Sequence, residues 1–191
     1  MKLIITETAQ CELKRFGFDI RKSIKRILRY IPLEDLRGIS HILVNDVMTV
    51  RPEKHKKLMA AYFKEQNKKK AHIELYLKGL FGHISDPANL RKLLPIQEYG
   101  LASTLFHEVG HHVREIRTHS IRNRLNEKFA ERYAWELLSK YIMDNAENIT
   151  ECFKNLEETA SLFNIKKDVL ENMRKGWEAV YRKAMSTNSH Q

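Results

Sequence analysis

Apolar residues near the start of the chain recur at helical spacing. They follow steps of three and four residues and so share one face of a helix, namely Ile20, Ile24, Ile27 and Ile31. The opposite face is basic and carries Arg21, Lys22, Lys25, Arg26 and Arg29. Pro32 cannot continue a helix. The pattern therefore predicts a helix from about 8 to 31 that packs its isoleucine face on a core.

Between residues 37 and 78 the periodicity shortens to that of β-strands. Three short runs stand out, 39–45, 59–65 and 71–77, and polar residues join the last two. Polar and apolar side chains alternate in the third run, in Ala71, His72, Ile73, Glu74 and Leu75. We expect a small antiparallel sheet, whose third strand offers an edge on which an extended peptide can pair.

From Pro95 to about 184 the pattern is helical throughout. It predicts a helix from about 96 to 117, a returning helix after a turn near 118–123, and two tail helices between about 146 and 184. The whole chain is predicted to be one α+β domain, 1–191. Its parts are an N-terminal helical region (1–36), a core (37–142) and a C-terminal helical extension (143–191).

Composition and charge limit the classes of protein to which this chain can belong. With 42% hydrophobic and 30% charged residues in 191, the chain has the composition of a globular protein. No apolar stretch is long enough for a membrane span, and the first residues do not form a signal peptide. Two cysteines without ligand spacing suit a reducing compartment, so we expect a cytoplasmic protein.

The net charge is +10, and residues 1–100 carry 20 Lys and Arg against 11 Asp and Glu. Nucleic acid is therefore a possible partner, although a solvated basic surface explains the same composition.

The segment HEVGH at 107–111 carries the chemistry. Positions i and i+4 of a helix share a face, so His107 and His111 can bind one metal ion, with Glu108 beside it as a proton acceptor. A catalytic zinc site takes three protein ligands and leaves one position open for water. A third ligand must therefore come from another element.

Helix geometry points to Glu127 as that ligand. From His111 to Thr118 the first helix rises roughly 10 Å, and a returning helix descends about as far by Glu127. Glu131, one turn further, would then lie level with His107, where it can accept the hydrogen of the ring nitrogen that faces away from the metal. Ala130 and Ala134 are small and would let the two helices approach closely.

These motifs resemble those of the gluzincin zinc peptidases, and most of all their small members, the minigluzincins and the ImmA-type peptidases. In that family the histidine motif is completed by E-x-x-A on a second helix, here Glu127 to Ala130, and the likeness spans residues 37–142. The resemblance implies a zincin-like core in which a Zn²⁺ ion is bound by His107, His111 and Glu127. Glu108 would be the general base and acid and Glu131 an outer partner of the site, a position where the family more often has Asp or Asn.

On this resemblance the reaction is peptide hydrolysis by an endopeptidase. The strand formed by Ala71, His72, Ile73, Glu74 and Leu75 would hold the substrate backbone. A tetrahedral oxyanion needs a further donor. Three residues have suitable chemistry, and the sequence does not choose among them: His119, Tyr133 and Tyr99.

Two alternatives remain open from the sequence. In a SprT-like protease, which acts in association with DNA, His119 would replace Glu127 as the third ligand. A zincin-like fold can also serve as a non-catalytic binding module, with the basic N-terminal half contacting nucleic acid or a partner protein. His112 is rotated by 100° from the neighbouring ligand position, and we expect it on the helix surface.

Overall fold

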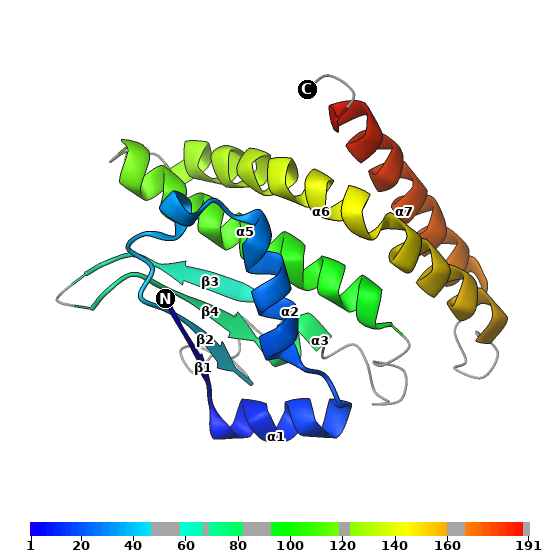
Figure 1. Ribbon diagram of the computed structural model, residues 1–191, viewed down its shortest axis with the longest axis horizontal. Helices are drawn as coiled ribbons and strands as arrows, with labels where there is room; N and C mark the ends of the chain where they lie inside the picture. The colour runs from blue at the N-terminus through cyan, green and yellow to red at the C-terminus, as the bar shows by residue number, and fades with distance from the viewer. Residues whose placement is uncertain (47–57, 67–68, 82–92, 119–122, 160–166, 189–191) are drawn as a thin grey trace.

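The described strands form one four-stranded sheet with strand order β1-β2-β4-β3 (Figure 1). The computed structural model describes residues 1–46, 58–66, 69–81, 93–118, 123–159 and 167–188. The strands are β1 (Lys2–Ile5), β2 (His41–Asn45), β3 (Ala60–Phe63) and β4 (His72–Tyr76). The three strands predicted from the sequence are confirmed, and β1 is an addition to them.

The prediction of an antiparallel sheet is wrong for two of its three strand pairs. β1 and β4 both run parallel to β2, and only β3 and β4 are antiparallel. Parallel neighbours need a crossover connection, which here consists of the helical region between β1 and β2. β4 is an inner strand, paired with β2 on one side and β3 on the other, and the edge strands of the described sheet are β1 and β3. The expectation of a free edge on the strand at 71–75 is therefore also wrong.

The predicted single helix from 8 to 31 is two helices, α1 (Glu7–Phe16) and α2 (Ile20–Ile27). Gly17 ends α1 in the left-handed region at a φ of 63°, where glycine carries no steric penalty. The Asp19 carboxylate then accepts a hydrogen bond from the Lys22 backbone N–H at 3.1 Å and caps α2. Two short 3-10 helices follow, Leu28–Tyr30 and Leu33–Leu36.

The C-terminal half is built from three long helices after a short one. The short helix is α3 (Leu77–Phe81). The long ones are α5 (Leu94–Thr118), α6 (Asn123–Thr159) and α7 (Lys167–Asn188). The pair of helices predicted around the HEVGH segment is confirmed. The first predicted tail helix is instead the continuation of α6, because neither glycine nor proline interrupts residues 123–159.

The core lies between the sheet and the helices. Ile42, Val44, Ile73 and Leu75 alternate along the central strands and are each at most 1% exposed. In Figure 1 α5 lies along the sheet, α6 along α5, and α7 along α6, while α2 crosses the front of α5. Among the described residues no helix combines the length and apolar character that a bilayer span requires.

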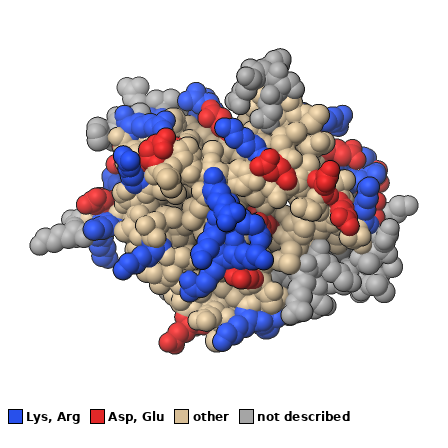
Figure 2. Space-filling view, viewed as in Figure 1, with Lys and Arg blue, Asp and Glu red and all other residues tan. Residues whose placement is uncertain are grey.

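Basic side chains that are scattered along the sequence lie together in the structure. Figure 2 shows Lys and Arg side chains concentrated at the centre of this face, over α2. The buried isoleucines of α2 point the other way, into the core. Folding thus converts the amphipathic pattern of this segment into a basic surface.

Candidate metal centre

The ligand candidates lie on two helices that pass unusually close to each other. A Cβ atom placed on Gly110 of α5 would lie 2.8 Å from the Ala130 Cα atom of α6 and 3.0 Å from its carbonyl oxygen. Only glycine at this position and a small residue opposite allow that approach. The close approach of the two helices that Ala130 predicted is confirmed, and it brings α6 within reach of the histidine face of α5.

The three predicted ligands converge. The Nε2 atoms of His107 and His111 are 3.1 Å apart. The Glu127 carboxylate places one oxygen 3.4 Å from the His107 Nε2 atom and the other 3.6 Å from the His111 Nε2 atom. In a tetrahedral zinc site with bonds of about 2.0 to 2.1 Å, any two ligand atoms are roughly 3.3 Å apart. The spacing of the side chains therefore fits a single small divalent ion.

The lowered pKa of His111 also favours the binding of a cation. Burial, together with the neighbouring His107 ring, lowers the pKa of His111, while the Glu127 carboxylate opposes that shift. A neutral imidazole offers the lone pair that a metal requires. Two imidazoles and one carboxylate form a donor set suited to zinc, which binds nitrogen and oxygen ligands in tetrahedral geometry. The side chains present thus fit the ion that the sequence suggested.

Glu108 lies next to the ligands in an apolar environment. The pKa of its carboxyl is raised to about 7: burial is the largest cause and the Glu127 charge adds to it, while a backbone hydrogen bond from Tyr62 acts in the opposite direction. A carboxyl with a pKa near neutrality can take up and release a proton under physiological conditions. Because Tyr62 belongs to β3, the same hydrogen bond ties Glu108 to the edge strand.

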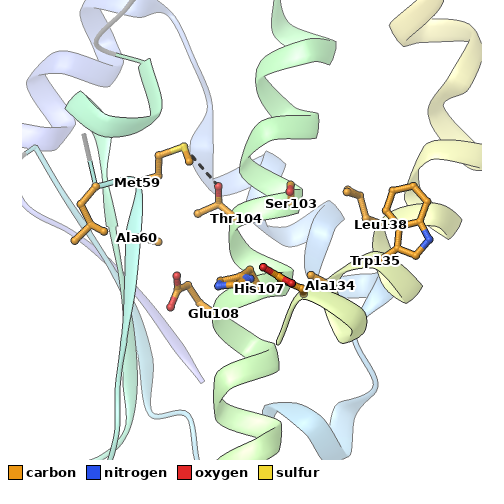
Figure 3. Close-up of a pocket in the computed structure, with 11 residues that line it drawn as sticks. Met59, Ala60, Ser103, Thr104, His107, Glu108, Ala134, Trp135 and Leu138 are labelled. Atoms are coloured by element: carbon orange, nitrogen blue, oxygen red, sulfur yellow. Dashed lines mark hydrogen bonds between the residues drawn. The ribbon is translucent and has the colours of Figure 1, made fainter. Parts of the chain in front are cut away.

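A pocket of about 400 Å³ opens beside His107 and Glu108. Figure 3 shows these two side chains between the β3 side of the pocket and the α6 side. The β3 side contributes Leu58, Met59 and Ala60, and α6 contributes Glu131, Ala134, Trp135 and Leu138. Ser103 and Thr104 of α5 complete the lining, and the Thr104 hydroxyl lies 3.9 Å from the Met59 sulfur. Six of its eleven lining residues are apolar, and the polar ones include both His107 and Glu108.

His112 is buried, contrary to the surface position expected from the sequence. Its exposed fraction is 2%. The His112 Nε2–H donates to the Arg37 carbonyl at 2.7 Å, and Nδ1 accepts from the Tyr62 hydroxyl at 3.0 Å. The expectation failed because α5 buries two faces, one against the sheet and one against α6, rather than a single stripe. His112 thereby anchors the strand residue whose backbone contacts Glu108.

Glu131 lies where the returning helix was expected to place it, but no contact defines its role. It is exposed and lines the pocket together with His107. Among the described residues, no hydrogen bond joins its carboxylate to the His107 ring. Its assignment as an outer partner of the metal site stays a prediction.

The structure does not bring the described oxyanion candidates to the pocket. The Tyr133 hydroxyl donates to the Asp35 carboxylate at 2.9 Å, which the Arg117 guanidinium also contacts at 2.7 Å. Tyr99 packs edge-on against Trp177, with ring centroids 6.0 Å apart. Neither tyrosine lines the pocket. His119 lies outside the described residues.

The strand predicted to bind substrate is occupied by other interactions. His72 and Glu74 project from β4 and lie 3.4 Å apart (Nε2 to Oε1), while Ile73 and Leu75 are buried in the core. The Ala71 carbonyl, just before β4, accepts from the Ser40 backbone N–H at 2.8 Å. The backbone edge next to the pocket belongs instead to β3, a strand that was not predicted from the sequence to bind substrate.

Three residues of the site were missed or misjudged in the sequence. Trp135 and Met59 line the pocket, and Tyr62 contacts Glu108, yet none of them stands in a recognisable motif. The one available signal was the position of Trp135, one turn beyond Glu131 on the ligand-bearing helix. No protein-family model, curated protein or solved structure matches this chain with significance.

Proposed function

We propose that this protein is a zinc-dependent endopeptidase with a zincin-like core. The observation that carries the proposal is the convergence of His107, His111 and Glu127, whose ligand atoms are separated by 3.1 to 3.6 Å. These three are the only group of at least three histidine, cysteine or acidic side chains with ligand spacing among the described residues.

Glu108 is the residue that moves protons in this proposal. Bound zinc supplies a Lewis acid that lowers the pKa of water toward neutrality and polarises a carbonyl group. The Glu108 carboxylate accepts the proton of the attacking water and passes it to the leaving amine, a task for which a pKa of about 7 is suitable. The hydrogen bond from Tyr62 holds the carboxylate in place between these two steps.

The edge strand and the pocket support a peptide as the substrate. Among the described strands β3 is paired on one side only, and an extended chain can add to its other side through backbone hydrogen bonds. The pocket beside Glu108 then receives one substrate side chain, and its lining by Met59, Trp135 and Leu138 favours an apolar one. This assignment moves substrate binding from the strand at 71–75 to residues 60–63.

Removal of the metal is expected to abolish hydrolysis. The purified protein would be incubated with unfolded casein, and new peptide termini would be counted by mass spectrometry. Treatment with ortho-phenanthroline should reduce cleavage to background, and added zinc should restore it, because the ion is needed for the chemical step. The non-chelating meta isomer of phenanthroline is the matched control. Cleavage that survives chelation, or full zinc occupancy without any cleavage, would contradict the proposed function.

A further inference from the structure

The basic surface over α2 is built from two adjacent rows of side chains. Arg21, Lys25 and Arg29 are spaced four residues apart, and so are Lys22 and Arg26. All five are exposed, and Figure 2 shows the resulting cluster. Like charges at this spacing repel each other, so the helix carries this surface at a cost to its own stability.

Within the described residues only part of this charge is neutralised. Arg26 pairs with the Glu98 carboxylate, with a distance of 2.9 Å from its Nε atom, and Arg21 donates to the Leu3 carbonyl at 3.5 Å. For Lys22, Lys25 and Arg29 the described part of the chain provides no salt-bridge partner. Three cations are thus left available to an external anion.

A hollow of about 640 Å³ continues the basic surface from α2 toward α6. Arg26, Arg29 and Lys140 contribute cations to its wall. The acidic groups that also line it are engaged: Glu98 accepts from Arg26, and Asp144 accepts from the Tyr30 hydroxyl at 3.0 Å. The three cations outnumber the two carboxylates, so the lining of the hollow carries a net charge of +1 and extends the basic surface of the helix.

We propose that the α2 surface and this hollow bind the phosphate backbone of a nucleic acid. From Arg21 to Arg29 the chain rises about 12 Å, a length over which duplex DNA presents about seven phosphate charges. Guanidinium groups match phosphate oxygens in geometry as well as charge. The apolar anchors that peptide or membrane docking uses are missing here, since Ile20, Ile24 and Ile27 of α2 are at most 1% exposed.

Charge reversal on α2 tests the proposal. The variant combines Lys22→Glu, Lys25→Glu and Arg29→Glu, and its control combines Lys69→Glu, Lys154→Glu and Arg182→Glu at other exposed positions. Each set lowers the net charge from +10 by two per substitution, to +4. The probe is a fluorescein-labelled DNA duplex, titrated by anisotropy between about 50 and 200 mM salt. We expect the α2 variant to bind more than about 10-fold more weakly, with a log–log salt slope reduced by about 2 to 3.

The control set decides between a specific surface and net charge. Equal losses of affinity in both triple variants, or no DNA binding by the wild type at the lowest salt, would overturn the proposal. So would binding to polyglutamate or to phosphatidylserine vesicles as tight as to DNA. Circular dichroism checks that both variants are folded. Glu108→Gln should bind DNA as the wild type does, which separates this result from the fate of the peptidase proposal.

Discussion

Replacing Glu108 with glutamine is expected to lower peptide hydrolysis by about 10³-fold while leaving the zinc content unchanged. Glutamine has nearly the same shape but cannot accept a proton, so the proposed proton transfer fails while the three ligands stay in place. The substitution removes the carboxyl group whose pKa of about 7, raised mainly by burial, suits it to proton transfer. Turnover of a fluorogenic peptide that the wild type cleaves, measured beside zinc content by mass spectrometry, checks both parts.

Glu115→Gln is the matched control for this experiment. Glu115 is seven residues further along α5, about two turns, and therefore shares the face of Glu108, yet it does not line the pocket. Its substitution makes the same chemical change, from a carboxyl to an amide, and should leave turnover within a few fold of the wild type. Similar losses in the two variants would show that the effect comes from the charge of the helix rather than from a base at 108.

The Glu127→Ala substitution should remove the metal itself. Glu127 is the ligand that we propose from α6, and its side chain is 60% exposed, so truncation costs little packing. Loss of an outer partner typically weakens metal binding about 10- to 100-fold, and loss of a direct ligand should exceed that range. Competition titration against a fluorescent zinc chelator measures the affinity.

Glu131→Ala gives the comparison that assigns the carboxylate. Glu131 lies one turn further on α6 and lines the pocket beside His107. The carboxylate that lies within 3.4 to 3.6 Å of the two histidine Nε2 atoms is that of Glu127. We expect its removal to weaken zinc binding by no more than about 100-fold, as for an outer partner. If Glu131→Ala lost the ion and Glu127→Ala kept it, the roles given to the two glutamates would have to be exchanged.

The candidate site was predictable because it depends on helix geometry. His107 and His111 are one turn apart, and counting the rise up one helix and down the next places Glu127 at the same level. Gly110 and Ala130 then indicate which faces meet, and the structure confirms their contact. Regular periodicity carries such arguments across about 20 residues without knowledge of the rest of the fold.

The sheet was less predictable because strand pairing is decided by distant residues. The spacing of β3 and β4 suggested their antiparallel pairing correctly, since a short connection permits little else. The parallel pairing of β1 with β2 depends on how α1 and α2 cross over, and β1 itself is only a four-residue strand. The exposed edge was assigned to the wrong strand because β4 pairs with β2 as well as with β3 and therefore lies inside the sheet.

Polar side chains buried between elements were also beyond the sequence. His112 and Tyr133 are positioned by partners 75 and 98 residues away, the Arg37 carbonyl and the Asp35 carboxylate. Local periodicity identifies which face of a helix is apolar but not which polar groups meet across the fold. In the structure His112 is therefore buried rather than at the surface, and Tyr133 does not line the pocket.

Anomalous X-ray diffraction at the zinc absorption edge, on crystals of the protein purified with zinc, tests the metal centre most directly. The account predicts one strong peak within about 2.2 Å of the His107 and His111 Nε2 atoms and a Glu127 carboxylate oxygen. A peak elsewhere, or crystals containing zinc without density between these three side chains, would contradict it.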